Sequence, residues 1–114
     1  MLNQVVLVGR LTRDPEVNKT ESNKHYSYIT LAVPRSFKNI NGEYETDFID
    51  CVLWDSVAKS TAEYCHKGDI VGVKGRIQSD VKEQEDGSKK YYMNIIAERV
   101  TFLSSNQATK KADE

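Results

Sequence analysis

The chain is short of the residues that define several classes of protein. Two cysteines, Cys51 and Cys65, are too few for a disulfide framework, and we expect two reduced, buried thiols. No apolar run approaches the roughly 20 residues that span a bilayer. Residues 1–4 lack the basic start of a signal peptide. We therefore expect a soluble, cytoplasmic protein that makes no membrane contact.

Neither charge sign is in excess. Lys and Arg total 16 and Asp and Glu total 17 among 114 residues, so the formal charge is −1. This balance gives no global attraction to a polyanion, and binding to one would need basic residues gathered on one surface. Length and a hydrophobic content of 39% fit one globular domain, which we place at residues 1–103 with a short polar tail at 104–114.

A run of apolar, β-branched residues predicts a strand at residues 2–11, and alternation of the two faces predicts strands at 25–36, 46–54 and 70–80. A last strand is expected at residues 89–103. Residues 16–24 are polar and predict a surface loop. Pro34 cannot donate to a ladder and should lie at an edge or a bulge. Turns are expected at Asn41 and Gly42 and at residues 85–88.

The pattern changes to helical spacing at residues 56–65, which predict the one helix. Asp55 or Ser56 could serve as its N-cap and Gly68 as its C-cap. Three strands, a helix and two strands predict an all-β OB-fold, a five-stranded Greek-key barrel with the helix between strands 3 and 4. That scaffold often binds oligonucleotides or oligosaccharides, but a fold alone does not decide function.

The sequence contains no catalytic or metal-binding constellation. Cys65 and His66 are adjacent without a second ligand pair, which favours a buried thiol beside a solvated imidazole. Gly72 and Gly75 fall in a strand, where barrel curvature or a close backbone explains them better than a phosphate loop. We therefore expect no enzymatic activity, no cofactor and no metal.

The third predicted strand carries the clearest binding signal. Phe48 and Trp54 share one of its faces about 20 Å apart, and Asp50 between them argues against a simple core face. Cations and further rings on neighbouring strands could follow a nucleic-acid strand: Arg10, Arg35, Lys74, Arg76, Tyr28 and Phe37. From this pattern, stacking of bases on Phe48 and Trp54 and a place in the barrel interior or an oligomer interface are equally supported.

Four blocks of the sequence resemble the bacterial single-stranded DNA-binding proteins. They are residues 1–16 (MLNQVVLVGRLTRDPE), 31–37 (LAVPRSF), 46–54 (TDFIDCVLW) and 67–78 (KGDIVGVKGRIQ), in order along residues 1–103. The resemblance implies an OB-fold, sequence-tolerant binding of single-stranded DNA and a homotetramer. It also implies that bases stack on Phe37, Phe48 and Trp54. We expect phosphate contacts from Arg10, Arg35, Lys38, Lys74, Arg76 and Lys82.

This chain also departs from the pattern that it resembles. Lys82 stands where another stacking aromatic is usual, Asp80 stands where a basic residue is common, and Asp55 and Ser56 replace a basic pair. We expect these changes to weaken binding per subunit. The sequence ends without the acidic, hydrophobic tip that recruits repair and replication enzymes, so it resembles a short form for which no tail-mediated recruitment is expected.

Two rival functions are weighed against a non-enzymatic protein that coats single-stranded DNA. The first is an OB-fold subunit whose aromatic face binds another protein in replication or recombination, and the near-neutral charge favours it. The second is a nucleotide-processing enzyme, which lacks any catalytic constellation. Neither the pathway nor a preference for DNA over RNA follows from the residues, because stacking tolerates both sugars.

Overall fold

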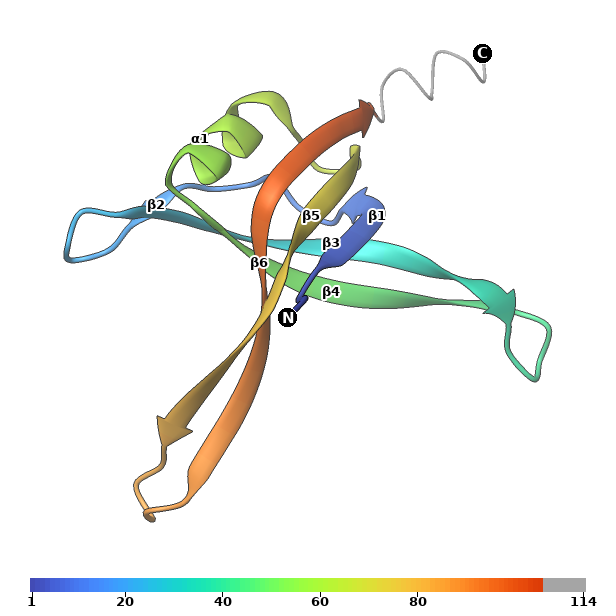
Figure 1. The fold of residues 1–114 in the computed structure, drawn as a ribbon. Helices are drawn as coiled ribbons and strands as arrows, with labels where there is room; N and C mark the ends of the chain where they lie inside the picture. The colour runs from blue at the N-terminus through green and yellow to red at the C-terminus, as the bar shows by residue number, and fades with distance from the viewer. Residues whose placement is uncertain (106–114) are drawn as a thin grey trace.

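The computed structural model describes residues 1–105, which form six strands and one short helix (Figure 1). The elements are β1 (Val5–Leu11), β2 (Asn18–Lys19), β3 (His25–Lys38), β4 (Tyr44–Trp54), α1 (Asp55–Tyr64), β5 (Ile70–Glu83) and β6 (Lys89–Ser104). The five predicted strands and the predicted helix are all confirmed, with ends that differ by up to three residues. Most of the predicted tail, residues 106–114, lies outside the described residues.

The sheet closes on itself as a barrel. Its strand order is β1-β5-β6-β4-β3-β2, and β1 also pairs with β3, so five strands complete the circle. All pairs are antiparallel except β4 with β6, which run parallel over three residues on each strand, starting at Cys51 and Ile95. Short β2 adds to the outside of this circle by pairing with the start of β3.

Strand β2 corrects the prediction of a plain loop at residues 16–24. Asn18 pairs with Tyr26 and Lys19 with His25. The turn between the two strands is held by Thr20, whose N–H donates to the carbonyl of Lys24 at 2.8 Å. Both faces of this segment are polar and exposed, so no hydrophobic alternation could have indicated the pairing.

The predicted caps of the helix are also wrong. Trp54 occupies the N-cap position, and its side chain makes no capping hydrogen bond. Asp55, at φ 49°, makes the bend from β4 into α1. Cys65 is the C-cap, and its N–H donates to the carbonyl of Thr61 at 2.9 Å. Gly68 lies in the next turn, where its N–H donates to the carbonyl of Leu11 at 2.8 Å. No helix within residues 1–105 is long and apolar enough to cross a membrane.

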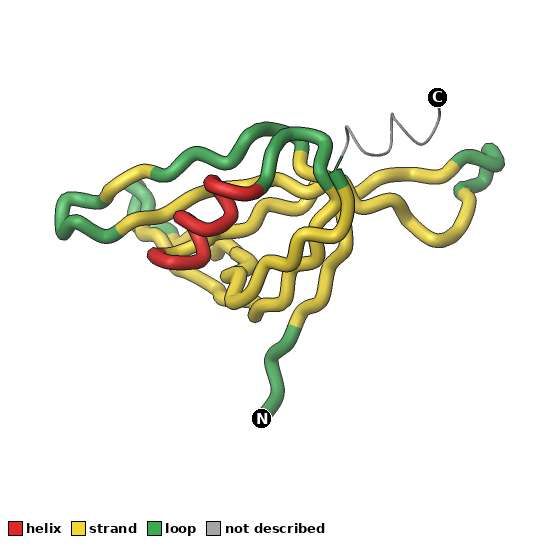
Figure 2. The backbone as a smooth tube through the Cα atoms, turned by 90° about the horizontal axis from the view of Figure 1, so that it is seen from above, coloured by secondary structure: helices red, strands yellow, loops and turns green. Residues whose placement is uncertain are grey.

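Inward-facing side chains of all five barrel strands fill the interior. Helix α1 lies against the barrel (Figure 2). The helix packs against β3, β4 and β6 and buries Ala58 and Thr61. The cluster consists of Leu11, Ile29, Leu31, Cys51, Leu53, Ala58, Cys65, Val71, Val73 and Ala97. Both thiols are free and buried, as predicted. Burial of each large apolar side chain contributes about 1.5–3 kcal/mol relative to its exposure.

One of the two glycines of β5 marks a close approach of backbones. A Cβ at Gly75 would lie 2.1 Å from the carbonyl oxygen of Ile96 on β6, so any side chain there would push β5 away from β6. A Cβ at Gly72 would meet only ordinary contacts. A close backbone, one of the two predicted explanations, therefore applies to Gly75, and Gly72 has no such close contact.

Two long hairpins extend beyond the barrel as arms, one formed by β3 and β4 and the other by β5 and β6 (Figure 1). The radius of gyration is 16.4 Å, against about 13 Å for a compact domain of about 100 residues. Gly42 and Gly87, at φ 77° and 86°, turn the two tips where turns were predicted. The register of β3 against β4 shifts between Pro34 and Lys38, which confirms the predicted bulge.

Candidate nucleic-acid interface

The strand register aligns the outward-facing positions of β3, β4, β6 and β5 into one surface, which we call the four-strand face. Tyr28 on β3 lies opposite Val52 on β4, Val52 opposite Ile96 on β6, and Ile96 opposite Arg76 on β5. The face comprises Tyr26, Tyr28, Thr30, Ala32, Phe48, Asp50, Val52, Trp54, Arg76, Gln78, Asp80, Lys82, Tyr92, Asn94 and Ile96.

Two of the predicted stacking rings stand on this face. Phe48 is 68% exposed and lies opposite Ala32. Trp54 is 38% exposed, and its ring centroid lies 5.7 Å from that of Tyr26. Tyr26 in turn meets Tyr28 edge to face at 5.4 Å. Phe48 and Trp54 therefore do not fill the interior of this barrel, which removes one of the alternatives left by the sequence.

The third predicted ring, Phe37, lies on the arm formed by β3 and β4, within the register shift between Pro34 and Lys38. It is 65% exposed. Its neighbour Lys38 places its Nζ 5.7 Å from the ring centroid of Tyr44 on the facing strand. The tip of this arm thus combines exposed rings with a cation, a combination suited to single-stranded nucleic acid.

The predicted cations of β5 follow the edge of the four-strand face. Arg76 is half-buried and donates from Nη1 to Oε1 of Gln78 at 2.8 Å. Lys82 shares its side of β5 and lies near the tip of the arm, opposite Lys90. Lys74 lies nearer the barrel, between Val6 of β1 and Arg99 of β6.

The other two predicted cations are held by groups of the protein itself. Arg10, at the end of β1, donates from Nη1 to the carbonyl of Gly68 at 2.7 Å. Arg35 pairs across the arm with Glu45 and with Asp47, whose Oδ1 lies 2.9 Å from Nη2. The hydrogen bond from Arg35 lowers the pKa of Asp47, and the same bond raises the pKa of Arg35. Two carboxylates thus surround one guanidinium.

Sequence reasoning missed Tyr92, which lies on the four-strand face opposite Asp80. It is 39% exposed, and Nζ of Lys90 lies 5.3 Å from its ring centroid. Its position on β6 has the same parity as Ile96, and that parity was the available signal. The sequence predicts a strand at residues 89–103, but only its register with β5 shows that this ring joins the face.

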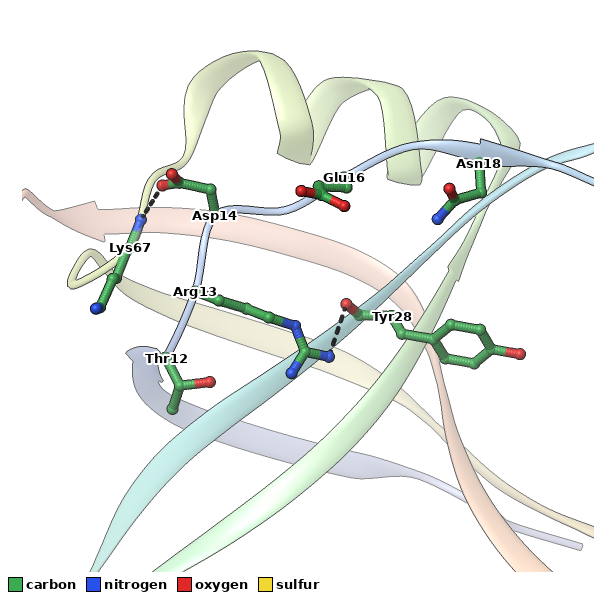
Figure 3. A pocket seen from close by; sticks show the side chains of 7 residues that line it. All are labelled: Thr12, Arg13, Asp14, Glu16, Asn18, Tyr28 and Lys67. Atoms are coloured by element: carbon green, nitrogen blue, oxygen red, sulfur yellow. Dashed lines mark hydrogen bonds between the residues drawn. The ribbon is translucent and has the colours of Figure 1, made fainter.

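A cleft of about 460 Å³ borders the four-strand face at Tyr28 (Figure 3). Its lining comprises Thr12, Arg13, Asp14, Glu16, Asn18, Tyr28 and Lys67, of which only Tyr28 is among the residues that the sequence proposes for the binding surface. Arg13 donates from Nη2 to the carbonyl of Tyr28 at 3.2 Å, and the N–H of Lys67 donates to Oδ1 of Asp14 at 2.8 Å. The lining therefore carries both charge signs. Within residues 1–105, no three His, Cys, Asp or Glu side chains group in a way that could hold a metal ion.

Comparison with known proteins gives one consistent result. Residues 2–103 match the model of the single-strand binding protein family. The chain is 47% identical over 113 residues to the Bacillus subtilis protein named single-stranded DNA-binding protein B, covering 99% of this chain and 100% of that one. It is 47% identical over 107 residues to single-stranded DNA-binding protein 1 of Lactococcus lactis, covering 94% of this chain and 71% of that one. It is 49% identical over 107 residues to single-stranded DNA-binding protein 3 of Listeria innocua, covering 94% of this chain and 67% of that one.

Proposed function

The chain belongs to the single-strand binding protein family, and from this premise we propose that it binds single-stranded DNA along the four-strand face. One observation carries the location: Phe48 and Trp54 stand exposed on the same side of β4, within a surface edged by cations of β5. In this proposal the protein coats the strand, protecting it from nucleases and from pairing, without catalysis. Replication, recombination, repair and DNA uptake all expose such strands.

Binding in this proposal combines stacking with phosphate contacts. Bases stack on Phe37, Phe48 and Trp54, and each stack is worth about 1 to 3 kcal/mol. Every base has a flat face, so this contribution depends little on sequence. Phosphates pair with the cations Arg10, Arg35, Lys38, Lys74, Arg76 and Lys82. Arg10 and Arg35 have protein acceptors already, so a phosphate at either must replace or share them.

The proposal includes an OB-fold and a homotetramer. The closed barrel of five strands with one helix supports the former. Outward positions of β1 support the latter, because Val6 and Val8 are 68% and 53% exposed and make an apolar strip beside Gly72 of β5. Another copy of the chain would cover this strip. Family membership also supports the cytoplasmic location expected from the sequence.

Fluorescence anisotropy of a labelled oligonucleotide tests the proposed function. Single-stranded DNA should bind and the matched duplex should bind far more weakly, since paired bases cannot stack on the rings. The logarithm of the binding constant should fall with the logarithm of salt concentration by about 0.7 per phosphate neutralised. Equal binding of duplex and single strand, or a flat salt dependence, would contradict the proposal and favour a protein partner for this face.

A further inference from the structure

Asp50 lies in the middle of the four-strand face, on β4 between Phe48 and Trp54. Its Oδ1 accepts a hydrogen bond from Oγ1 of Thr30, the residue opposite it on β3, at 2.6 Å. No residue among 1–105 donates to its second oxygen, Oδ2. Thr30 therefore holds the carboxylate in one orientation and leaves one charged acceptor without a protein partner.

The surroundings of Asp50 include a place for the edge of a base. Asp50, Phe48 and Asn94 line a hollow of about 300 Å³, formed where β4 and β6 separate beyond their short parallel pairing. Asn94 donates from Nδ2 to Asp80 at 3.0 Å, so its Oδ1 is the amide atom left without a donor among the described residues. A base stacked on Phe48 would thus meet two open acceptors at this hollow, Oδ2 of Asp50 and Oδ1 of Asn94.

Acceptors of this kind distinguish bases by their exocyclic groups. Cytosine presents an N4 amino donor, to which an aspartate can bond, whereas uracil and thymine present a carbonyl oxygen at the same position. A carboxylate repels that oxygen. We propose that Asp50 is a specificity-determining residue, which favours bases with an exocyclic amino group over those with a carbonyl there. This inference rests on the proposed function and adds a base preference to otherwise sequence-tolerant binding.

Asp50 also has an effect that is independent of the base. Its negative charge repels phosphates of any sequence, and salt screens that repulsion. Asp80 provides a matched comparison on the same face. Its two oxygens already accept hydrogen bonds from the amides of Gln78, at 3.2 Å, and Asn94, at 3.0 Å. Asp80 therefore supplies repulsion without an open acceptor, and the two effects can be separated.

The test compares Asp50→Asn with Asp80→Asn in the full chain. Deoxycytidine and deoxyuridine oligomers of equal length compete against labelled oligo-dT at mildly alkaline pH, where cytosines do not pair with one another. An asparagine amide can accept from cytosine or donate to uracil. Asp50→Asn should therefore lower the ratio of cytosine to uracil affinity by about three- to tenfold, the value of one hydrogen bond. Asp80→Asn should tighten both oligomers equally and leave the ratio unchanged.

Three outcomes would overturn the inference. If both oligomers bind and Asp50→Asn leaves their ratio unchanged, Asp50 does not read bases. If Asp80→Asn lowers the ratio as much as Asp50→Asn, the effect belongs to charge alone. If wild type binds neither oligomer, the proposed function fails first and this inference with it. Asp50→Ala, checked by circular dichroism, serves as a second variant and should also lose the preference.

Discussion

The indole ring of Trp54 lies against the phenol ring of Tyr26, with ring centroids 5.7 Å apart and ring planes inclined by 49°. The two residues are direct partners across β3 and β4. Tyr26 thus restricts the orientations open to Trp54 before any ligand arrives. A ring already held in place loses less side-chain freedom on binding, which favours affinity.

Replacing Trp54 with alanine should weaken binding of oligo-dT by about 1 to 3 kcal/mol, because one base loses its stacking surface. Anisotropy titrations give both dissociation constants. Tyr64→Ala is the matched control, since Tyr64 is 65% exposed on α1 and lies outside the four-strand face. Equal losses in the two variants would mean that exposed aromatic area in general, rather than this position, supports binding.

Replacing Lys82 with tryptophan should tighten binding mainly at high salt, by up to about 1 to 3 kcal/mol. Stacking keeps its strength in salt while the ion pair of a lysine does not. The salt slope should become shallower by roughly 0.7 for each subunit engaged. Lys59→Trp on α1 is the control and should change neither quantity. Weaker binding by Lys82→Trp at every salt concentration would show that the lysine has a role that a ring cannot replace.

The apolar strip of β1 predicts the oligomeric state. Light scattering of the wild type should give four times the chain mass of 13.0 kDa. Val8→Glu should reduce that mass, because it puts a charge into the proposed contact, whereas Val81→Glu should not. Val81 is a fair control because it is 54% exposed and Val8 is 53% exposed. A wild-type mass near 13.0 kDa would contradict the tetramer.

Burial predicts how the Cys51 thiol responds to pH. Desolvation, with a smaller effect from Asp50, raises the pKa of Cys51 to about 11. In the unfolded chain the thiol titrates near about 8.5. Its contribution to stability is therefore complete below about pH 8.5 and is lost as the pH rises toward about 11.

The Cys65→Ala variant isolates this thiol for measurement. A thiol reagent should label Cys51 at mildly alkaline pH only as fast as the protein unfolds, and urea should speed the reaction. The urea concentration at the midpoint of unfolding should decrease as the pH is raised from about 8.5 to about 11. The decrease should be smaller when Cys51 is also replaced by alanine. Labelling of the folded protein as fast as of the unfolded chain would show that Cys51 is accessible.

Sequence alternation predicted the barrel strands well because each strand buries one face and exposes the other. Ile29 and Leu31 on β3 face inward while Thr30 between them faces outward, and this is the period that the sequence carries. Strand β2 has no such contrast, since both Asn18 and Lys19 are exposed. Its pairing depends on where the chain turns back, which no local pattern records.

Residues that share a surface were harder to predict, because the sequence of a single strand does not determine its register with the neighbouring strand. Tyr92 joins the four-strand face only through the pairing of β6 with β5. The ion pairs of Arg35 with Glu45 and Asp47 depend on a two-residue shift beyond Pro34. The register at the turn places Arg35 opposite Asp47 and the register at Pro34 places it opposite Glu45, so neither register alone indicates both partners.

The most direct measurement of the central claim is the emission of Trp54, the one tryptophan in the chain, during titration with oligo-dT. A base stacked on the indole should quench this emission, saturating at the same oligomer concentration as the anisotropy signal of the DNA. The matched duplex should produce little quenching. If anisotropy shows saturated binding while Trp54 emission is unchanged, the strand does not pass over Trp54, and the proposed location of binding is contradicted.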